Sequence, residues 1–263
     1  MRLKVIAFLL VVATSAAGML AAEDTNGDHQ ITVLLPVAFA PEETLPGAHE
    51  SAWRGEVWIH NASGVGFAHQ PTPYGCHIDI VCGIAPGFVG VAESVVSNGN
   101  SGGALFFIPE GLAKDVFITN RIHEITGGAQ PLGVGMPVVW EGDFLEGTSE
   151  YLGIPVAPIN RVAIRVYDPF PRAESQVLIE ILNAAGEVIE SWTLAAKPVP
   201  APDSHPMLPG FDAVYDLVGR FPSLVSEQFI HLRMTPMREG MTYWTLVSVT
   251  ENSTQHVTLI TPR

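Results

Sequence analysis

The stretch from Arg161 to Leu194 constrains the fold most, because it alternates strand-like segments with turn-forming segments. In Val162–Tyr167 apolar residues recur at every second position, the pattern of a strand with one buried face. Val177–Leu182 and Val188–Leu194 are further strand candidates, and Asn183–Gly186 between them suits a hairpin loop. The stretch lacks the spacing of three or four residues that a helix needs. It therefore predicts a three-stranded antiparallel meander.

Short segments of the same kind continue on both sides of this stretch, separated by turns. The 25 Gly and 21 Pro among 263 residues favour many short strands over long helices. One short helix is predicted within Phe211–Arg220, and the looser pattern of Glu141–Pro158 marks a candidate domain junction. Strands at intervals of about ten residues, with few helices between them, are typical of antiparallel β-sandwiches. We therefore expect an all-β fold with at most one or two short helices.

The N-terminus has the three-part layout of a secretory signal peptide. Arg2 and Lys4 precede an apolar run at Val5–Val12, and small residues follow as far as Ala22. The apolar run is shorter than the roughly 20 residues of a membrane-spanning helix. We expect cleavage after Ala22 or a few residues earlier, a secreted or periplasmic location, and no membrane span in the mature chain.

The charge balance limits the possible partners. The chain carries 27 acidic and 13 basic residues, a formal net charge of -14, and loss of Arg2 and Lys4 would bring it to about -16. Such an acidic surface repels phosphate backbones, which argues against nucleic acid as a partner. An unidentified protein or glycan is the expected partner.

The two cysteines, Cys76 and Cys82, fit an oxidising compartment. Together with export they predict one disulfide that closes a small loop. A metal site formed with His77 would lack a fourth ligand at a usual spacing. We therefore favour the disulfide.

One segment looks like the surroundings of a catalytic serine. Gly99–Gly103, with Ser101 at its centre, resembles the GDSGG segment of chymotrypsin-like proteases, and His60 or His69 with Asp79 would complete a triad. However, too few residues precede Ser101 for the barrels that normally come before that serine. We interpret the segment as a turn and predict no catalytic residue and no cofactor, with a serine hydrolase acting through Ser101 as an alternative.

Two acidic segments have alternative interpretations. Asp24–Asp28 resembles the first half of a calcium loop, but His29 replaces the expected glycine and Leu35 the expected bidentate glutamate. The acidic residues of Glu141–Glu146 would suit acid–base chemistry only if a cleft held two of them at a set separation. We predict no metal site, while calcium binding at the first segment stays open.

Aromatic residues are the remaining candidates for a binding role. Exposed tryptophans and tyrosines on one open sheet face would stack on sugar rings and make a carbohydrate-binding module, whereas buried ones would belong to the core. The candidates are Trp53, Trp58, Trp140, Trp192, Trp244, Tyr74, Tyr151 and Tyr243.

A set of short segments spread over most of the mature chain carries a resemblance to known proteins. These segments are Leu35–Val37, Trp53–Asn61, Asn120–Ile122, Arg161–Tyr167, Asn183–Val188 and Ser248–Thr254. Together they resemble a group of uncharacterised secreted bacterial proteins with tandem immunoglobulin-like sandwich domains. The resemblance implies two immunoglobulin-like antiparallel β-sandwich domains, and it implies no activity. The signal peptide at 1–22 and the candidate junction within Glu141–Pro158 give the expected bounds of these domains, 23–157 and 158–263. We expect a non-catalytic binding or architectural protein, with a carbohydrate-binding module as an alternative.

Overall fold

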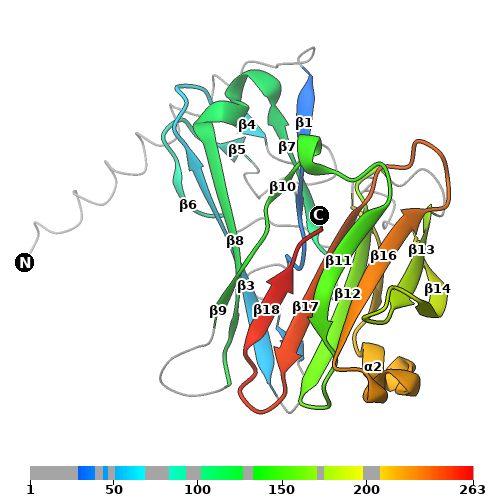
Figure 1. Ribbon diagram of the computed structural model, residues 1–263. Coiled ribbons are helices and arrows are strands. Elements are labelled where there is room, and N and C mark those ends of the chain that lie inside the picture. Colours follow the sequence, from blue (N-terminus) through cyan, green and yellow to red (C-terminus); the bar gives the residue numbers. More distant parts are fainter. Residues whose placement is uncertain are drawn as a thin grey trace, which may run out of the picture.

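The structure is a computed structural model that describes residues 29–38, 44–46, 51–68, 83–92, 102–126, 133–170, 175–197 and 208–262. These residues form mainly antiparallel β-strands, which confirms the all-β class (Figure 1). The described helices are short: α2 (Leu217–Arg220) and the 3-10 helices η2 (Glu110–Asp115), η3 (Glu141–Asp143) and η4 (Pro222–Ser226).

The N-terminal part of the chain packs two sheets against each other. The β1 sheet has the order β10 (Val139–Trp140), β1 (Gln30–Leu35), β7 (Ala104–Pro109). The β3 sheet has the order β2 (Leu45–Pro46), β3 (Ala52–Asn61), β8 (Val116–Glu124), β9 (Gly133–Met136), with β6 (Val89–Val91) also paired to β3. A separate pair joins β4 (Phe67–Ala68) to β5 (Gly83–Ile84). Val33 and Phe106 of the β1 sheet share one hydrophobic core with Val57 and Ile59 of the β3 sheet.

The C-terminal part forms a second pair of sheets. The β12 sheet has the order β15 (Gly210–Val214), β12 (Asn160–Asp168), β17 (Trp244–Glu251), β18 (Val257–Ile260). The β13 sheet has the order β11 (Ser149–Pro155), β16 (Phe229–Pro236), β13 (Ser175–Leu182), β14 (Val188–Ala196). Val162 and Ile164 of β12 share a core with Val177 and Ile179 of β13. Each part of the chain therefore has the two-layer core of a β-sandwich. We call the β1 and β3 sheets the first sandwich, and the β12 and β13 sheets the second sandwich.

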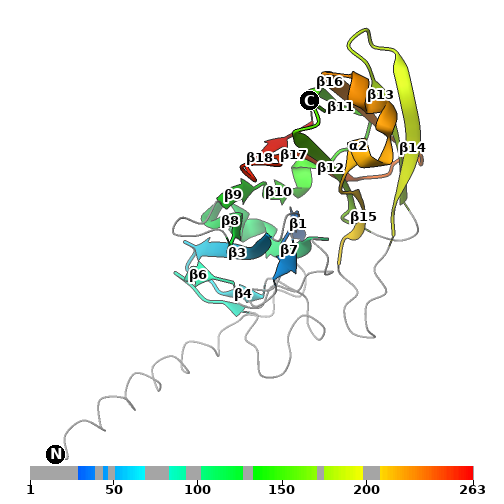
Figure 2. The same cartoon turned by 90° about the horizontal axis from the view of Figure 1, so that it is seen from below.

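A third core joins the two pairs of sheets. Leu34 and Leu105, on the other side of the β1 sheet, lie in one cluster with Tyr167, Trp244 and Leu246 of the β12 sheet. Seen from below, β12 and β17 lie between β1 and β7 on one side and β13 and β16 on the other (Figure 2). Strands β7 and β17 are consequently buried on both faces and nearly continuously apolar, whereas β3 alternates between buried and partly or fully exposed residues.

The predicted meander is wrong in one connection. The strands at Val162–Tyr167, Val177–Leu182 and Val188–Leu194 all exist, and β13 pairs with β14 as expected. However, β12 pairs with β15 and β17 in the opposite sheet. Asp168, which is 2% exposed, shapes this crossover because its carboxylate accepts hydrogen bonds from the Phe170 amide, at 2.8 Å, and from the Ser175 hydroxyl. The chain therefore leaves one sheet and enters the other between β12 and β13.

The short helix predicted within Phe211–Arg220 is confirmed as α2, Leu217–Arg220. The first half of that segment is instead strand β15, which pairs with β12. The Asp216 carboxylate accepts a hydrogen bond from the Gly219 amide at 3.0 Å and so caps this short helix.

The predicted junction at Glu141–Pro158 contains a strand that the sequence pattern did not reveal. Strand β11 ends before the predicted boundary at 157/158, yet it pairs with β16 of the β13 sheet. Residues on the N-terminal side of that boundary thus complete a sheet of the C-terminal part of the chain.

Candidate functional site

The outer face of the β3 sheet is the clearest candidate for a binding surface. Alternation along β3 directs Val57 and Ile59 into the core and therefore places the intervening side chains on the opposite face. The register continues this face across the neighbouring strand β8, with the pairs Arg54 and His123, Glu56 and Arg121, Trp58 and Thr119, and His60 and Phe117.

Three aromatic side chains lie together at one end of this face, and we call them the aromatic platform: Trp58, His60 and Phe117. Trp58 is 46% and Phe117 58% exposed, and the rings of His60 and Phe117 lie 5.7 Å apart at an interplanar angle of 30°. Val89 of β6, paired with His60, is 66% exposed and extends the apolar surface. Grouped exposed apolar side chains of this kind mark interaction sites more often than isolated ones do.

Polar groups lie beside Trp58 on this face. The indole Nε1 of Trp58 donates a hydrogen bond to Glu56 Oε2 at 3.5 Å, and the exposed Thr119 lies directly across from Trp58 on β8. The face thus combines flat apolar rings with hydroxyl and carboxylate groups. This combination can contact a ligand that has both apolar and hydroxyl-bearing surfaces.

Several of the other predicted aromatic candidates belong to the core. Trp244 is 7% exposed, and Tyr151 and Tyr243 are fully buried. The Tyr151 hydroxyl donates to the Thr245 carbonyl oxygen at 3.0 Å, and the Tyr243 hydroxyl donates to the Gly147 carbonyl oxygen at 2.7 Å. Burial raises the pKa of both tyrosines, so they act as neutral hydrogen-bond donors inside the second sandwich.

The remaining tryptophans are partly buried: Trp53, Trp140 and Trp192. Trp192 packs against Phe221 with ring centroids 4.8 Å apart, and the Arg220 guanidinium lies 5.7 Å from the centre of its ring. Trp58 is therefore the one predicted tryptophan, among those the structure describes, that is mainly available to a ligand.

Other sequence predictions fall on positions that the structure does not describe. Ser101, with His69 and Asp79, lies outside the described residues, so the hydrolase alternative stays a prediction. The same holds for the disulfide between Cys76 and Cys82, for the acidic segment Asp24–Asp28 and for Tyr74.

The acidic loop has a structural role at Glu141, whose Oε2 accepts a hydrogen bond from the Thr32 amide at 2.7 Å. Within the described ranges, no group of three His, Cys, Asp or Glu side chains is placed to hold a metal ion. No helix in that part of the chain has the length and apolar character needed to cross a bilayer.

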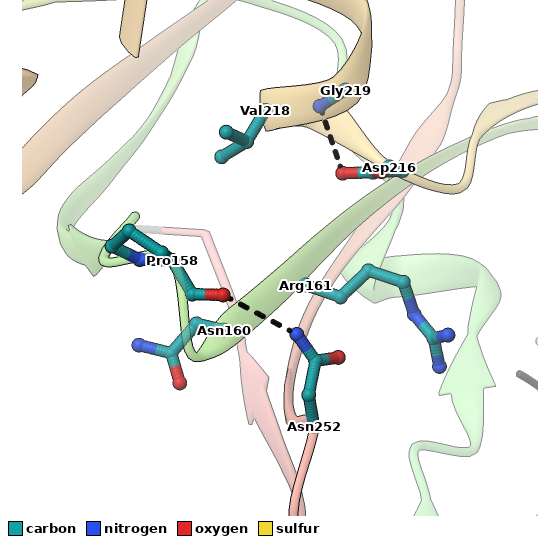
Figure 3. A pocket seen from close by; sticks show the side chains of 7 residues that line it. All are labelled: Pro158, Asn160, Arg161, Asp216, Val218, Gly219 and Asn252. Carbon is teal, nitrogen blue, oxygen red and sulfur yellow. Dashed lines mark hydrogen bonds between the residues drawn. The ribbon is translucent and has the colours of Figure 1, made fainter. Parts of the chain in front are cut away.

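A hollow of about 400 Å³ lies at one end of the second sandwich, between α2 and the start of β12 (Figure 3). Partial burial lowers the pKa of Arg161 beside it, and the Asp216 carboxylate acts in the opposite direction. Asp216 is bonded to the Gly219 amide, and Asn252 Nδ2 lies 3.5 Å from the Pro158 carbonyl oxygen that accepts from it. Because the Asp216 and Asn252 side chains bind the protein's own backbone, and none of the described lining residues is aromatic, we interpret the hollow as a junction between elements.

The sequence analysis named Trp58 as a binding candidate and His60 only as a possible triad histidine, and it did not name Phe117. The sequence did contain an indication of this face. Phe117 alternates along β8 in step with Thr119 and Arg121, so the three side chains share one face, and Trp58 shares a face of β3 with Arg54. A large aromatic residue on a strand face that otherwise carries polar residues indicates an exposed ring. The pairing of β3 with β8, which brings the rings together, could not be read locally.

Comparison of the chain with protein families, with curated proteins and with solved structures finds no match.

Proposed function

We propose that this chain is a secreted, non-catalytic binding module of two immunoglobulin-like sandwich domains, and that the outer face of its β3 sheet binds glycans. The observation that carries the proposal is the exposure of Trp58 and Phe117 on adjacent strands of one open sheet face. The export and the immunoglobulin-like relationship rest on the sequence patterns described above.

The chemistry of the platform suits sugar rings. A pyranose presents C–H groups on its faces, which are attracted to the electron-rich face of an aromatic ring. Its hydroxyl groups, which lie around the ring edge, find hydrogen-bonding partners in Glu56 and Thr119 beside Trp58. A single ring stacked on Trp58 would therefore satisfy both its apolar and its polar surfaces.

The shape of the face favours an extended glycan over a small molecule. Small-molecule sites are concave and enclose most of their ligand. Here the contact groups lie along two paired strands, from Arg54 to His60 on β3 and from Phe117 to His123 on β8. A polysaccharide chain can follow such a face and contact several side chains in sequence.

Affinity electrophoresis of the mature protein through gels that contain soluble polysaccharides tests the proposal, with tryptophan fluorescence as a second readout. We expect retarded migration in at least one gel and saturable quenching. Trp58→Ala should weaken the binding by about tenfold or more.

Phe229→Ala is the matched control, because Phe229 is 50% exposed but lies on β16 of the β13 sheet. Its binding should equal that of the unmodified protein. The proposal is wrong if no glycan binds, or if Trp58→Ala binds as tightly as Phe229→Ala.

A further inference from the structure

The outer face of the β3 sheet is divided into an aromatic end and a basic end. Along β3, Arg54 and Trp58 are four residues apart on the same face, about 13 Å at the usual strand rise. His123 lies across from Arg54, and Arg121 lies across from Glu56. A ligand that stacks on Trp58 and continues along the strands must therefore pass beside two arginines.

These arginines have no carboxylate bound to them within the described chain. Neither Arg54 nor Arg121 forms an ion pair within 4.0 Å or a hydrogen bond with a described residue, and both side chains are exposed. Glu56, the acidic residue of this face, instead accepts the hydrogen bond from Trp58 Nε1. The two guanidinium groups are consequently available to an external anion.

A glycine on the neighbouring strand shapes the basic end. Gly133 of β9 pairs with His123, and a methyl group added at Gly133 would come within 2.6 Å of a guanidinium nitrogen of Arg121. The Arg121 head group therefore lies over the bare backbone of β9. The absence of a side chain at Gly133 therefore leaves room for the guanidinium group close to the sheet.

The charge of this face contrasts with that of the whole chain. The chain has 27 acidic and 13 basic residues, whereas the described outer face carries Arg54 and Arg121 against Glu56 alone. A polyanion is repelled by most of an acidic protein and is favoured where cations face solvent. Guanidinium groups also match the geometry of carboxylate and sulfate groups with two parallel hydrogen bonds.

We propose, on the basis of the glycan-binding function, that the ligand is an anionic polysaccharide whose sugar rings stack on the aromatic platform while its acidic groups bind Arg54 and Arg121. Carboxylate and sulfate groups share the chemistry that these arginines recognise. A nucleic acid or an acidic peptide would supply charge without the pyranose faces that the platform requires.

Polygalacturonate and its fully methyl-esterified form test this inference, because they share one backbone and differ in charge. At low ionic strength the mature protein should bind the acid form about tenfold more tightly than the ester, and added salt should reduce the difference. Dextran sulfate compared with unmodified dextran provides the sulfate arm. Polyglutamate, which has charge but no sugar rings, should bind weakly.

Two sets of variants separate the two ends of the face. The double variant Arg54→Gln/Arg121→Gln should bind both forms of polygalacturonate with affinities within about twofold of each other, whereas Trp58→Ala should weaken both. Arg238→Gln is the control, because Arg238 is exposed and lies outside the β3 sheet. It should keep the preference for the acid form.

The outcomes distinguish this inference from the proposed function. Equal binding of a neutral and an acidic polysaccharide, with loss of both in Trp58→Ala, overturns the anionic ligand and supports glycan binding. Polyglutamate bound as tightly as polygalacturonate, or an acid preference that survives in the double variant, also overturns it. Absence of binding to any polysaccharide refutes both the function and the inference.

Discussion

The side-chain amide of Asn120 donates a hydrogen bond to the backbone carbonyl oxygen of Pro36, with 2.8 Å between Nδ2 and the oxygen. Asn120 belongs to β8 and is 2% exposed, while Pro36 directly follows β1. The bond therefore links the two sheets of the first sandwich in its interior.

Asn120→Ala should lower the free energy of unfolding by about 1–3 kcal/mol, because it leaves a buried carbonyl oxygen without a donor. Urea unfolding measures the change. Thr119→Ala, which alters the adjacent but exposed residue, is the control and should change stability little. Equal effects of the two substitutions would contradict a stabilising role for the Asn120 bond.

Gly103 and Gly186 offer a matched pair of glycines for a second prediction. Their φ angles are +80° and +81°, but an added Cβ at Gly103 would lie 2.7 Å from the Leu35 carbonyl oxygen, and one at Gly186 meets nothing within 4 Å. Gly186→Ala should cost about 1–2 kcal/mol from backbone strain alone. Gly103→Ala should cost about 1–3 kcal/mol more, because backbone atoms must move apart. Denaturant unfolding curves of the two variants compare these costs. Similar midpoint shifts would show that the close approach of Gly103 to the Leu35 carbonyl oxygen adds nothing to the free-energy cost of the substitution.

The sequence identified strands well, but it could not assign them to sheets. Alternation in Val162–Tyr167 shows which side chains share a face, and it holds whichever strand lies alongside. The partner strand β17 begins at Trp244, far along the chain. The crossover after Asp168 could therefore not be predicted from the local sequence pattern. Strand β11 was missed for a local reason: its pairing with β16 shifts register between Tyr151 and Ile154, and Gly153 in this irregular stretch has φ +68°. The shift breaks the alternation that identifies a strand.

The candidate site was predictable only in part, for the same reason. Trp58 alternates along β3 with the buried Val57 and Ile59, but the sequence analysis named it only as one of eight aromatic candidates and did not single it out as exposed. The contact between His60 and Phe117 depends on the register of β3 against β8, and no local pattern specifies that register.

A third prediction concerns Phe117. Because its ring is 58% exposed, Phe117→Ala should change the melting temperature little, yet it should weaken glycan binding by about threefold to tenfold through loss of the ring beside His60. Fluorescence titration and thermal unfolding of the same sample measure both quantities. A large fall in melting temperature, or unchanged affinity, would show that Phe117 has another role.

The turn after β17 should respond to acid. Hydrogen bonds from the hydroxyl groups of Ser253 and Thr254 lower the pKa of Glu251 below its usual value of 4.5. Since the folded pKa is the lower one, this contribution to stability is present above about pH 4.5 and is lost as the pH falls through the lowered pKa. The double variant Ser253→Ala/Thr254→Ala should move the pKa of Glu251, measured by carboxyl NMR titration, back toward 4.5. An unchanged titration would contradict the role of these hydroxyls.

Alkaline pH should unfold the protein together with the ionisation of three tyrosines. Burial raises the pKa of Tyr151, Tyr167 and Tyr243 above the usual value of 10.0. Below pH 10 these side chains are neutral in the folded and the unfolded state, so their full contribution to stability is present. Above pH 10 they ionise in the unfolded chain first, and the free energy of unfolding therefore falls as the pH rises toward the folded pKa.

Tyrosinate absorbance and the circular dichroism of the β-sheets, recorded over the same pH series, test this coupling. The absorbance of the buried tyrosines should rise in the same transition in which the sheet signal is lost. Tyr167→Phe should reduce the absorbance change in that transition, because Tyr167 lies in the core that joins the β1 and β12 sheets and cannot ionise there without exposing that core to water. Complete tyrosinate formation while the sheet signal is still native would instead show that the core opens to hydroxide without unfolding.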